Sequence, residues 1–124
     1  MRVKKVHIVG GGLAGLVTGL HLLKCGIKVT IFEKNSYPKH KVCGEYISNE
    51  VLPYLKSLDI YPMKYGATSL TKLECSSAKG DILKTELPLG GFGISRYALD
   101  NILYNAFLDR GGEVLLEQVE KIIY

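Results

Sequence analysis

The sequence predicts an α/β fold in which parallel strands are joined by a helix and an antiparallel hairpin is inserted later in the chain. Two segments, Val3 to Val9 and Lys28 to Glu33, are rich in β-branched residues, as buried strands are. Between them, apolar residues recur at helical spacing up to about Lys24. Only short turns separate the helix from the two strands, as a parallel crossover requires. The predicted order is therefore strand, helix, strand.

Turn-forming residues place the end of this helix and the segments that follow the second strand. The helix is predicted to end near Cys25, because Gly26 tolerates the positive φ of a helix terminus. Loop-forming residues then run from Asn35 to Gly44. Ser48 is a suitable cap for a short helix that continues to about Leu58.

The remaining predicted elements are the hairpin, a second long helix and a last strand. Residues 70–75 and 82–87 flank the turn-forming residues 78–81, which indicates two antiparallel strands. An amphipathic helix is predicted to follow Ser95 and to continue to about Arg110, closed by a pair of glycines. A strand is then predicted over residues 113–119.

Composition favours one compact domain over residues 1–124 and excludes some functions. Apolar residues make up 47% of the 124 residues, which is enough for a hydrophobic core. The net charge of +4 is mildly basic, but the lysines form no run of like charges, so we expect no nucleic-acid binding. No stretch approaches the roughly 18 apolar residues of a transmembrane helix. A cytoplasmic protein is expected, and peripheral contact with an anionic membrane stays open.

Cysteine and histidine positions give no sign of a metal site. The three cysteines lack the paired spacing of zinc ligands and of a redox motif, so free thiols are expected at Cys25, Cys43 and Cys75. The three histidines are unclustered: His7, His21 and His40. No metal ligand and no catalytic residue are assigned from the sequence.

A glycine-rich motif lies between the first strand and the first helix. Residues 10–15 read Gly-Gly-Gly-Leu-Ala-Gly and satisfy the G-x-G-x-x-G pattern in the strand-turn-helix context that the pattern needs. Gly10 allows a sharp turn, Gly12 lets the backbone approach a diphosphate, and Gly15 lets the helix pack closely. Backbone N–H groups and the helix dipole then favour a diphosphate at the helix start.

An acidic residue follows the glycines by about 20 residues, where a dinucleotide-binding fold places one. Glu33 ends the second strand and can accept hydrogen bonds from the hydroxyls of an adenosine ribose. A carboxylate there repels a 2′-phosphate, so FAD or NAD is predicted over NADP. The alternative is that the glycines only make a tight turn and that Glu33 is a solvated strand end. The whole pattern predicts a Rossmann-like domain.

Two later segments resemble a known family. Lys41 to Ser48 looks like the Cys-Gly-Glu segment of geranylgeranyl reductases and related flavoproteins with the para-hydroxybenzoate hydroxylase fold. Gly93 to Asp100 resembles the arginine-bearing helix start of the same family, and the Gly-Gly-Glu-Val of residues 111–114 resembles its next strand. The resemblance spans essentially the whole chain and implies FAD as the cofactor, with NAD(P)H as a candidate electron donor.

The resemblance also implies roles for individual residues. Ala14, Gly15 and Glu33 would contact the ADP half of FAD, and Val119 would meet the adenine through its backbone. Cys43 and Gly44 would lie along the flavin-bearing part, and Arg96 would contact the cofactor. Taken alone, Arg96 could instead be a surface side chain and Cys43 a small buried one. The full set of predicted cofactor-binding residues is Gly10, Gly12, Ala14, Gly15, Glu33, Lys34, Cys43, Gly44, Arg96 and Val119.

The implied function is that of the FAD-binding part of a flavin-dependent oxidoreductase. Resemblance to the reductases points to reduction of double bonds in an isoprenoid or lipid-like small molecule. The alternatives are a monooxygenase of the same fold and a non-catalytic nucleotide-binding module, whereas a halogenase is less favoured because the chain has no tryptophan. Members of the family are longer and carry a substrate domain. We therefore expect a truncated chain, the N-terminal part of a longer flavoprotein, inactive alone.

Overall fold

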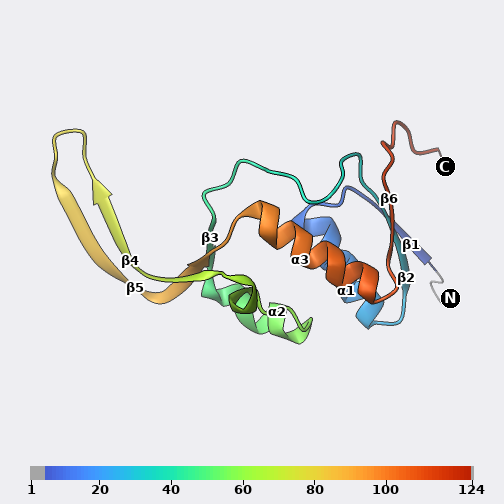
Figure 1. The fold of residues 1–124 in the computed structure, drawn as a ribbon, viewed down its shortest axis with the longest axis horizontal. Coiled ribbons are helices and arrows are strands. Elements are labelled where there is room, and N and C mark those ends of the chain that lie inside the picture. The colour runs from blue at the N-terminus through green and yellow to red at the C-terminus, as the bar shows by residue number, and fades with distance from the viewer. Residues whose placement is uncertain (1–4, 124) are drawn as a thin grey trace. The chain divides into compact units, whose positions relative to one another are not determined.

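The computed structural model describes residues 5–123, which divide into two compact units (Figure 1). The first unit combines Met1–Lys41 with Arg96–Tyr124, and the second unit is Val42–Ser95. The first unit contains both halves of the predicted parallel fold. The second unit contains the inserted hairpin. The expectation of one domain over residues 1–124 stays a prediction.

The first unit is built on a parallel sheet with the strand order β1-β2-β6. Val9 at the end of β1 pairs with Phe32 at the end of β2, and Phe32 pairs with Leu115 at the end of β6. The carboxyl ends of all the strands therefore meet at one edge, which is where ligands bind in open α/β sheets. Its elements are β1 (Lys5–Val9), α1 (Leu13–Lys24), β2 (Lys28–Phe32), α3 (Arg96–Asp109) and β6 (Glu113–Leu115).

Helices α1 and α3 pack closely and share the core of the first unit. Leu16 and Leu20 of α1 are fully buried, as is Phe107 of α3. A Cβ on Gly19 would lie 2.7 Å from Cε2 of Phe107, so the absence of a side chain at Gly19 lets the ring approach the helix. Each buried Leu or Phe side chain contributes about 1.5–3 kcal/mol through removal of apolar surface from water.

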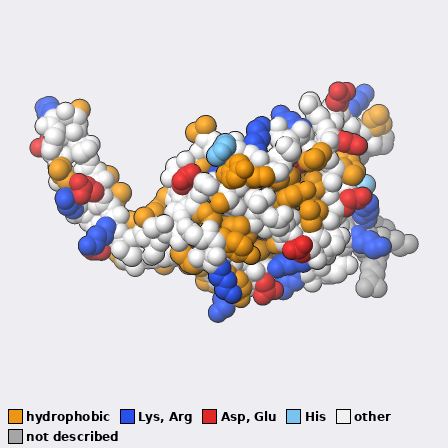
Figure 2. All heavy atoms as spheres, in the orientation of Figure 1, with side chains coloured by type: hydrophobic (Ala, Val, Ile, Leu, Met, Phe, Trp, Pro, Cys, Tyr) orange, Lys and Arg blue, Asp and Glu red, His pale blue; other side chains and the backbone are white. Residues whose placement is uncertain are grey.

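The second unit is an antiparallel sheet with the strand order β3-β5-β4 and short helical turns. Strands β4 and β5 form a long hairpin whose turn is closed by a bond from Ser77 N–H to the Asp81 carbonyl at 2.9 Å. Figure 2 shows basic and acidic side chains side by side on this hairpin, where Lys84 and Glu74 pair at 2.9 Å. The elements are β3 (Tyr46–Ser48), the 3₁₀ turn Asn49–Val51, α2 (Leu52–Ser57), the 3₁₀ turn Pro62–Tyr65, β4 (Thr68–Ser76) and β5 (Ile82–Gly93).

Most of the predicted elements are present, with differences at their ends. Helix α1 ends at Lys24 as predicted, and the Ser48 side chain accepts the Glu50 N–H at 3.4 Å as a cap. The last strand is shorter than predicted. It stops at Leu115 because the Glu117 N–H bonds back to the Leu115 carbonyl at 2.9 Å, which turns the chain out of the sheet. The first two residues of the predicted strand Val3 to Val9 lie outside the described residues.

None of the helices within residues 5–123 has the length and hydropathy to cross a bilayer. Free thiols were expected at Cys25, Cys43 and Cys75, and all three are free in the structure; they are also exposed. Across the same described residues, no group of three or more His, Cys, Asp or Glu side chains is arranged to hold a metal ion.

Candidate functional site

The glycine motif forms a tight turn from β1 into α1. Gly10 has a φ of +99°, a conformation that L side chains rarely adopt, and its N–H bonds to the Phe32 carbonyl at 2.8 Å. A Cβ on Gly15 would overlap the Gly10 carbonyl oxygen, so the first turn of the helix lies directly against the bend. Gly12 is the N-cap residue, and because it has no side chain it makes no hydrogen bond to the first N–H groups of the helix. The first N–H groups of α1 therefore have no partner within the helix and suit an anion.

Glu33 lies against this turn. Its Oε2 accepts the Gly11 N–H at 2.7 Å, and its Oε1 accepts the Asn35 N–H at 2.9 Å and the Asn35 side-chain amide at 3.1 Å. The carboxylate thus joins the end of β2 to the glycine turn. Both carboxylate oxygens have protein partners, so Glu33 is not simply a solvated strand end. A role of the glycines beyond a tight turn stays a prediction.

The charge of Glu33 is stabilised by these neighbours. Partial burial by itself would raise the pKa of Glu33, but the hydrogen bonds from Gly11 and Asn35, with the positive charge of Lys41, outweigh burial and lower that pKa below its ordinary value. Glu33 is therefore ionised at neutral pH. An ionised carboxylate accepts hydrogen bonds from ribose hydroxyls and repels a 2′-phosphate.

Tyr37 bonds to the carbonyl group of Gly11, the residue whose N–H bonds to Glu33. Its hydroxyl donates to the Gly11 carbonyl oxygen, and its ring stacks on Tyr104 of α3 with centroids 4.1 Å apart and planes 8° apart. Burial, followed by the negative charge of Glu33, raises the pKa of Tyr37 above its ordinary value. The hydroxyl is therefore protonated and remains a donor across the physiological pH range.

A buried carboxylate on α3 holds two cations beside the glycine turn. Asp100 has a side chain only 2% exposed and accepts from Arg96 Nε at 2.8 Å, Arg96 Nη2 at 3.1 Å and Lys41 Nζ at 3.1 Å. A Cβ built on Gly12 would lie 3.7 Å from Lys41 Nζ and 4.0 Å from Arg96 Nη2. Both cations therefore face the backbone at the helix start. Arg96 is 19% exposed, so it is not the surface side chain of the alternative interpretation.

A cavity of about 260 Å³ opens at the carboxyl edge of the parallel sheet. It brings together four of the predicted cofactor-binding residues, which come from three separate parts of the first unit. They are Gly10, Glu33, Lys34 and Val119. Because Val119 lies beyond the shortened β6, the turn at Leu115 is what brings residues 117–119 to this cavity.

Apart from Arg96, which bonds to Asp100, the other predicted residues fall into two groups. Gly12, Ala14 and Gly15 lie at the cap and first turn of α1, as the motif implies. Cys43 and Gly44 belong to the second unit, in an exposed irregular segment where the Glu45 N–H donates to the Cys43 sulfur at 3.3 Å. The interpretation of Cys43 as a small buried side chain is therefore wrong.

Sequence reasoning missed three residues of this arrangement: Tyr37, Lys41 and Asp100. One signal was visible, since Arg96 and Asp100 are four residues apart on a predicted helix and so share a face. Lys41 gave no such signal, because its contact with Asp100 joins residues 59 positions apart.

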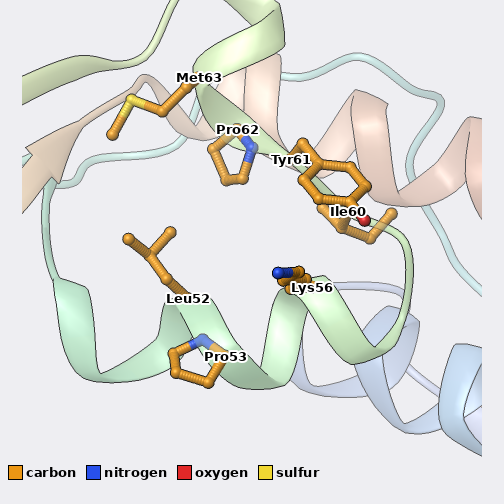
Figure 3. Close-up of a pocket in the computed structure, with 7 residues that line it drawn as sticks. All are labelled: Leu52, Pro53, Lys56, Ile60, Tyr61, Pro62 and Met63. Carbon is orange, nitrogen blue, oxygen red and sulfur yellow. The ribbon is translucent and has the colours of Figure 1, made fainter.

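The second unit has a larger cavity of about 470 Å³, of different character (Figure 3). Figure 3 shows Leu52 and Pro53 from α2 facing Pro62 and Met63 across it, with Lys56 as the single charged group among the lining residues. This lining is apolar and offers no array of donors for a diphosphate. None of the predicted cofactor-binding residues lines it.

Comparison with known proteins agrees with the geometry of the first unit. The family model described as "FAD binding domain" matches residues 3–61. Over 57 residues the chain is 40% identical to 6-hydroxy-3-succinoylpyridine 3-monooxygenase HspB of Pseudomonas putida, a match that covers 46% of this chain and 14% of that protein.

Solved structures show the same fold over nearly the whole chain. A tetrameric form of 2-methyl-3-hydroxypyridine-5-carboxylic acid oxygenase matches with a TM-score of 0.80 and 22% identity, covering 93% of this chain and 32% of that one. The flavin-dependent brominase Bmp2 matches with a TM-score of 0.81 and 19% identity, covering 100% of this chain and 31% of that one. The chain thus spans about a third of the length of these two proteins. The predicted Rossmann-like FAD-binding fold is confirmed, and the cofactor is FAD.

Proposed function

We propose that this chain is the FAD-binding part of a flavin-dependent monooxygenase that acts on a small organic molecule. The observation that carries the proposal is the arrangement around the glycine turn. It combines bare backbone at Gly12, an ionised carboxylate at Glu33 and a cavity at the carboxyl edge of the sheet. This combination suits a dinucleotide with a diphosphate, a ribose and an adenine.

The residues present fit FAD at identifiable positions. The opening N–H groups of α1 would hold the diphosphate, Glu33 would accept from the ribose hydroxyls, and the cavity beside Lys34 and Val119 would take the adenine. Cys43 and Gly44 would lie along the flavin-bearing part. When bound, FAD supplies the electron-transfer chemistry, and the chain supplies binding and orientation.

The choice of monooxygenase departs from our first expectation. The Cys43-Gly44-Glu45 segment resembles that of reductases acting on isoprenoid or lipid-like substrates. The comparisons instead favour the monooxygenase alternative, because the relative with 40% identity is named as a monooxygenase and the solved neighbour with a TM-score of 0.80 as an oxygenase. An isoprenoid substrate is not confirmed by them, and NAD(P)H as electron donor stays a prediction.

Absorption spectroscopy tests the cofactor part of the proposal. The purified chain should take up FAD and show flavin absorption bands, with quenched flavin fluorescence on titration. A colourless chain that binds NAD in place of FAD would refute the proposal. In the complete protein, NADPH-driven oxygen consumption coupled to substrate hydroxylation would support a monooxygenase, whereas double-bond reduction without oxygen uptake would support the reductase. A complete protein that binds FAD and shows neither activity would be a nucleotide-binding module.

A further inference from the structure

Asp100 is among the most buried polar residues of the described chain, with 1% of its surface exposed, and it is surrounded by positive charge. Three hydrogen bonds reach its carboxylate, two from Arg96 and one from Lys41. Lys41 lies in the loop that follows β2, and Arg96 begins α3. A single carboxylate therefore fixes two cations from distant parts of the sequence.

We propose that Lys41 and Arg96 form a two-cation clamp for the diphosphate of the cofactor, and that Asp100 is the positioning residue that sets this clamp. The inference rests on the proposed binding of FAD. It adds Lys41 and Asp100 to the residues that the glycine motif and the family resemblance predict, and it gives Arg96 a specific ligand group.

The location of the two cations supports this assignment. Lys41 Nζ lies 3.7 Å, and Arg96 Nη2 lies 4.0 Å, from the position that a Cβ of Gly12 would occupy. A phosphate oxygen that approaches the bare backbone of Gly12 enters this space and meets both cations. The helix start supplies backbone donors from one side, and the clamp supplies charged donors from another.

The charges also suit a diphosphate. Asp100 offsets one of the two positive charges, and Glu33, whose charge Lys41 also stabilises, lies near the other. A diphosphate at this place supplies negative charge to both cations and to the positive end of the α1 dipole. Without an anion on α3 the two cations would repel each other, whereas Asp100 holds them close together before the ligand arrives. Such preorganisation lowers the cost of ordering side chains on binding.

A purely structural role for the ion pairs is the competing explanation. The bond from Lys41 to Asp100 attaches the loop after β2 to α3, and breaking a buried pair by removing one partner destabilises a fold. If the ion pairs are purely structural, removing one partner should weaken the binding of every ligand to a similar extent. A phosphate clamp predicts a loss that depends on whether the ligand carries phosphate.

Calorimetric titration of the 124-residue chain with ADP and with adenosine separates these explanations. For Lys41→Met, affinity for ADP should fall by about 10- to 100-fold, the range for loss of a charge-assisted hydrogen bond, while affinity for adenosine stays unchanged. The dependence of ADP binding on salt should also become weaker, because one charge is lost. Lys39→Met is the matched control, since Lys39 lies in the same loop but bonds to Asn35 at 2.8 Å. It should bind both ligands as the unchanged chain does.

Asp100→Asn tests the positioning role with a side chain of the same shape. Affinity for ADP should fall by about tenfold, with adenosine unchanged and with the circular dichroism of the folded chain retained. If Asp100→Asn does not fold, Lys41→Met alone decides the role of the clamp.

Two results would overturn the clamp: unchanged ADP binding by Lys41→Met, or parallel losses of ADP and adenosine. Unchanged or tighter ADP binding by Asp100→Asn would remove the positioning role. Failure of the unsubstituted chain to bind ADP or FAD would instead refute the proposed function and the clamp together. The two failures are therefore distinguishable.

Discussion

The Glu33 carboxylate accepts the backbone N–H of Gly11 at 2.7 Å, and this bond joins the end of β2 to the turn that begins α1. The acid and the glycines of a dinucleotide-binding pattern are usually described as separate contacts to the ligand. In this chain they also contact each other. Glu33 therefore has two roles, as a predicted ribose acceptor and as a fixed support for the glycine turn.

Replacing Glu33 by glutamine should weaken FAD binding and change the choice of nucleotide. The glutamine side chain keeps an acceptor for Gly11 but loses the charge, so FAD affinity should fall by about tenfold, as expected for loss of a charge-assisted bond. Repulsion of a 2′-phosphate also disappears, so the affinity for NADP relative to NAD should rise. Titration with the three nucleotides measures both effects. Tight NADP binding by the unsubstituted chain that Glu33→Gln weakens would contradict this role.

The lowered pKa of Glu33 predicts a pH dependence of stability. A carboxyl whose pKa is lower in the folded state than in the unfolded state stabilises the fold above the unfolded pKa, and this stabilisation is lost as pH falls through the folded pKa. The usual glutamate value is about 4.5, so the contribution should be complete at neutral pH and should decline below that value.

Urea unfolding of the unchanged chain and of Glu33→Gln checks this expectation. The unchanged chain should be the more stable near neutral pH, and the difference in the free energy of unfolding should shrink as the pH falls below about 4.5. Glu113, whose pKa is lowered mainly by its bond from Thr30, is common to both proteins and cancels in the difference. A difference that stays constant down to strongly acidic pH would show that the Glu33 charge does not stabilise the fold.

Tyr37→Phe should lower stability by about 1 kcal/mol, the usual contribution of a hydrogen bond. The substitution removes the hydroxyl that donates to the Gly11 carbonyl but keeps the ring stacked on Tyr104. Tyr97→Phe is the matched control, because Tyr97 also stacks on a ring, that of His40, at 4.4 Å. Thermal unfolding should show a change within about 0.5 kcal/mol for the control. Equal effects of both substitutions would show that the bond to Gly11 contributes nothing specific.

The sequence was sufficient to predict the parallel part of the fold because its signals are local. Apolar spacing places α1, and its end at Lys24 follows from Gly26, which has a φ of +76°. Strand β3 was missed because three residues carry too little pattern to identify a strand. The extension of β5 to Gly93 was missed because its last part contains glycines rather than β-branched residues.

The candidate site was predictable to the extent that it lies in the glycine motif and at strand ends. Gly10, Glu33 and Val119 line one cavity, as the resemblance and the motif imply. The cluster around Asp100 was not predictable, because its burial results from the packing of α3 against segments far away in the sequence. An aspartate within an amphipathic helix is usually a solvated residue, and only the fold shows that this one is 1% exposed.

Gly12 and Gly15 should respond differently to alanine, because one position has space around it and the other does not. A Cβ on Gly15 would overlap the Gly10 carbonyl, so Gly15→Ala should destabilise the fold by about 1–3 kcal/mol, which exceeds the gain of up to about 1 kcal/mol from the helix propensity of alanine. A Cβ on Gly12 would meet its nearest atom at 3.7 Å, and its φ of −78° is ordinary for alanine.

Gly12→Ala should therefore stay folded, with a loss of less than about 1 kcal/mol, the range for a poorer N-cap. Its affinity for FAD should nevertheless fall by at least about tenfold, because the methyl group enters the space that the diphosphate would occupy. Urea unfolding and fluorescence titration with FAD measure the two quantities on the same samples. If Gly12→Ala binds FAD as tightly as the unchanged chain, the diphosphate does not lie against Gly12, and the ligand position inferred from the glycine turn is wrong.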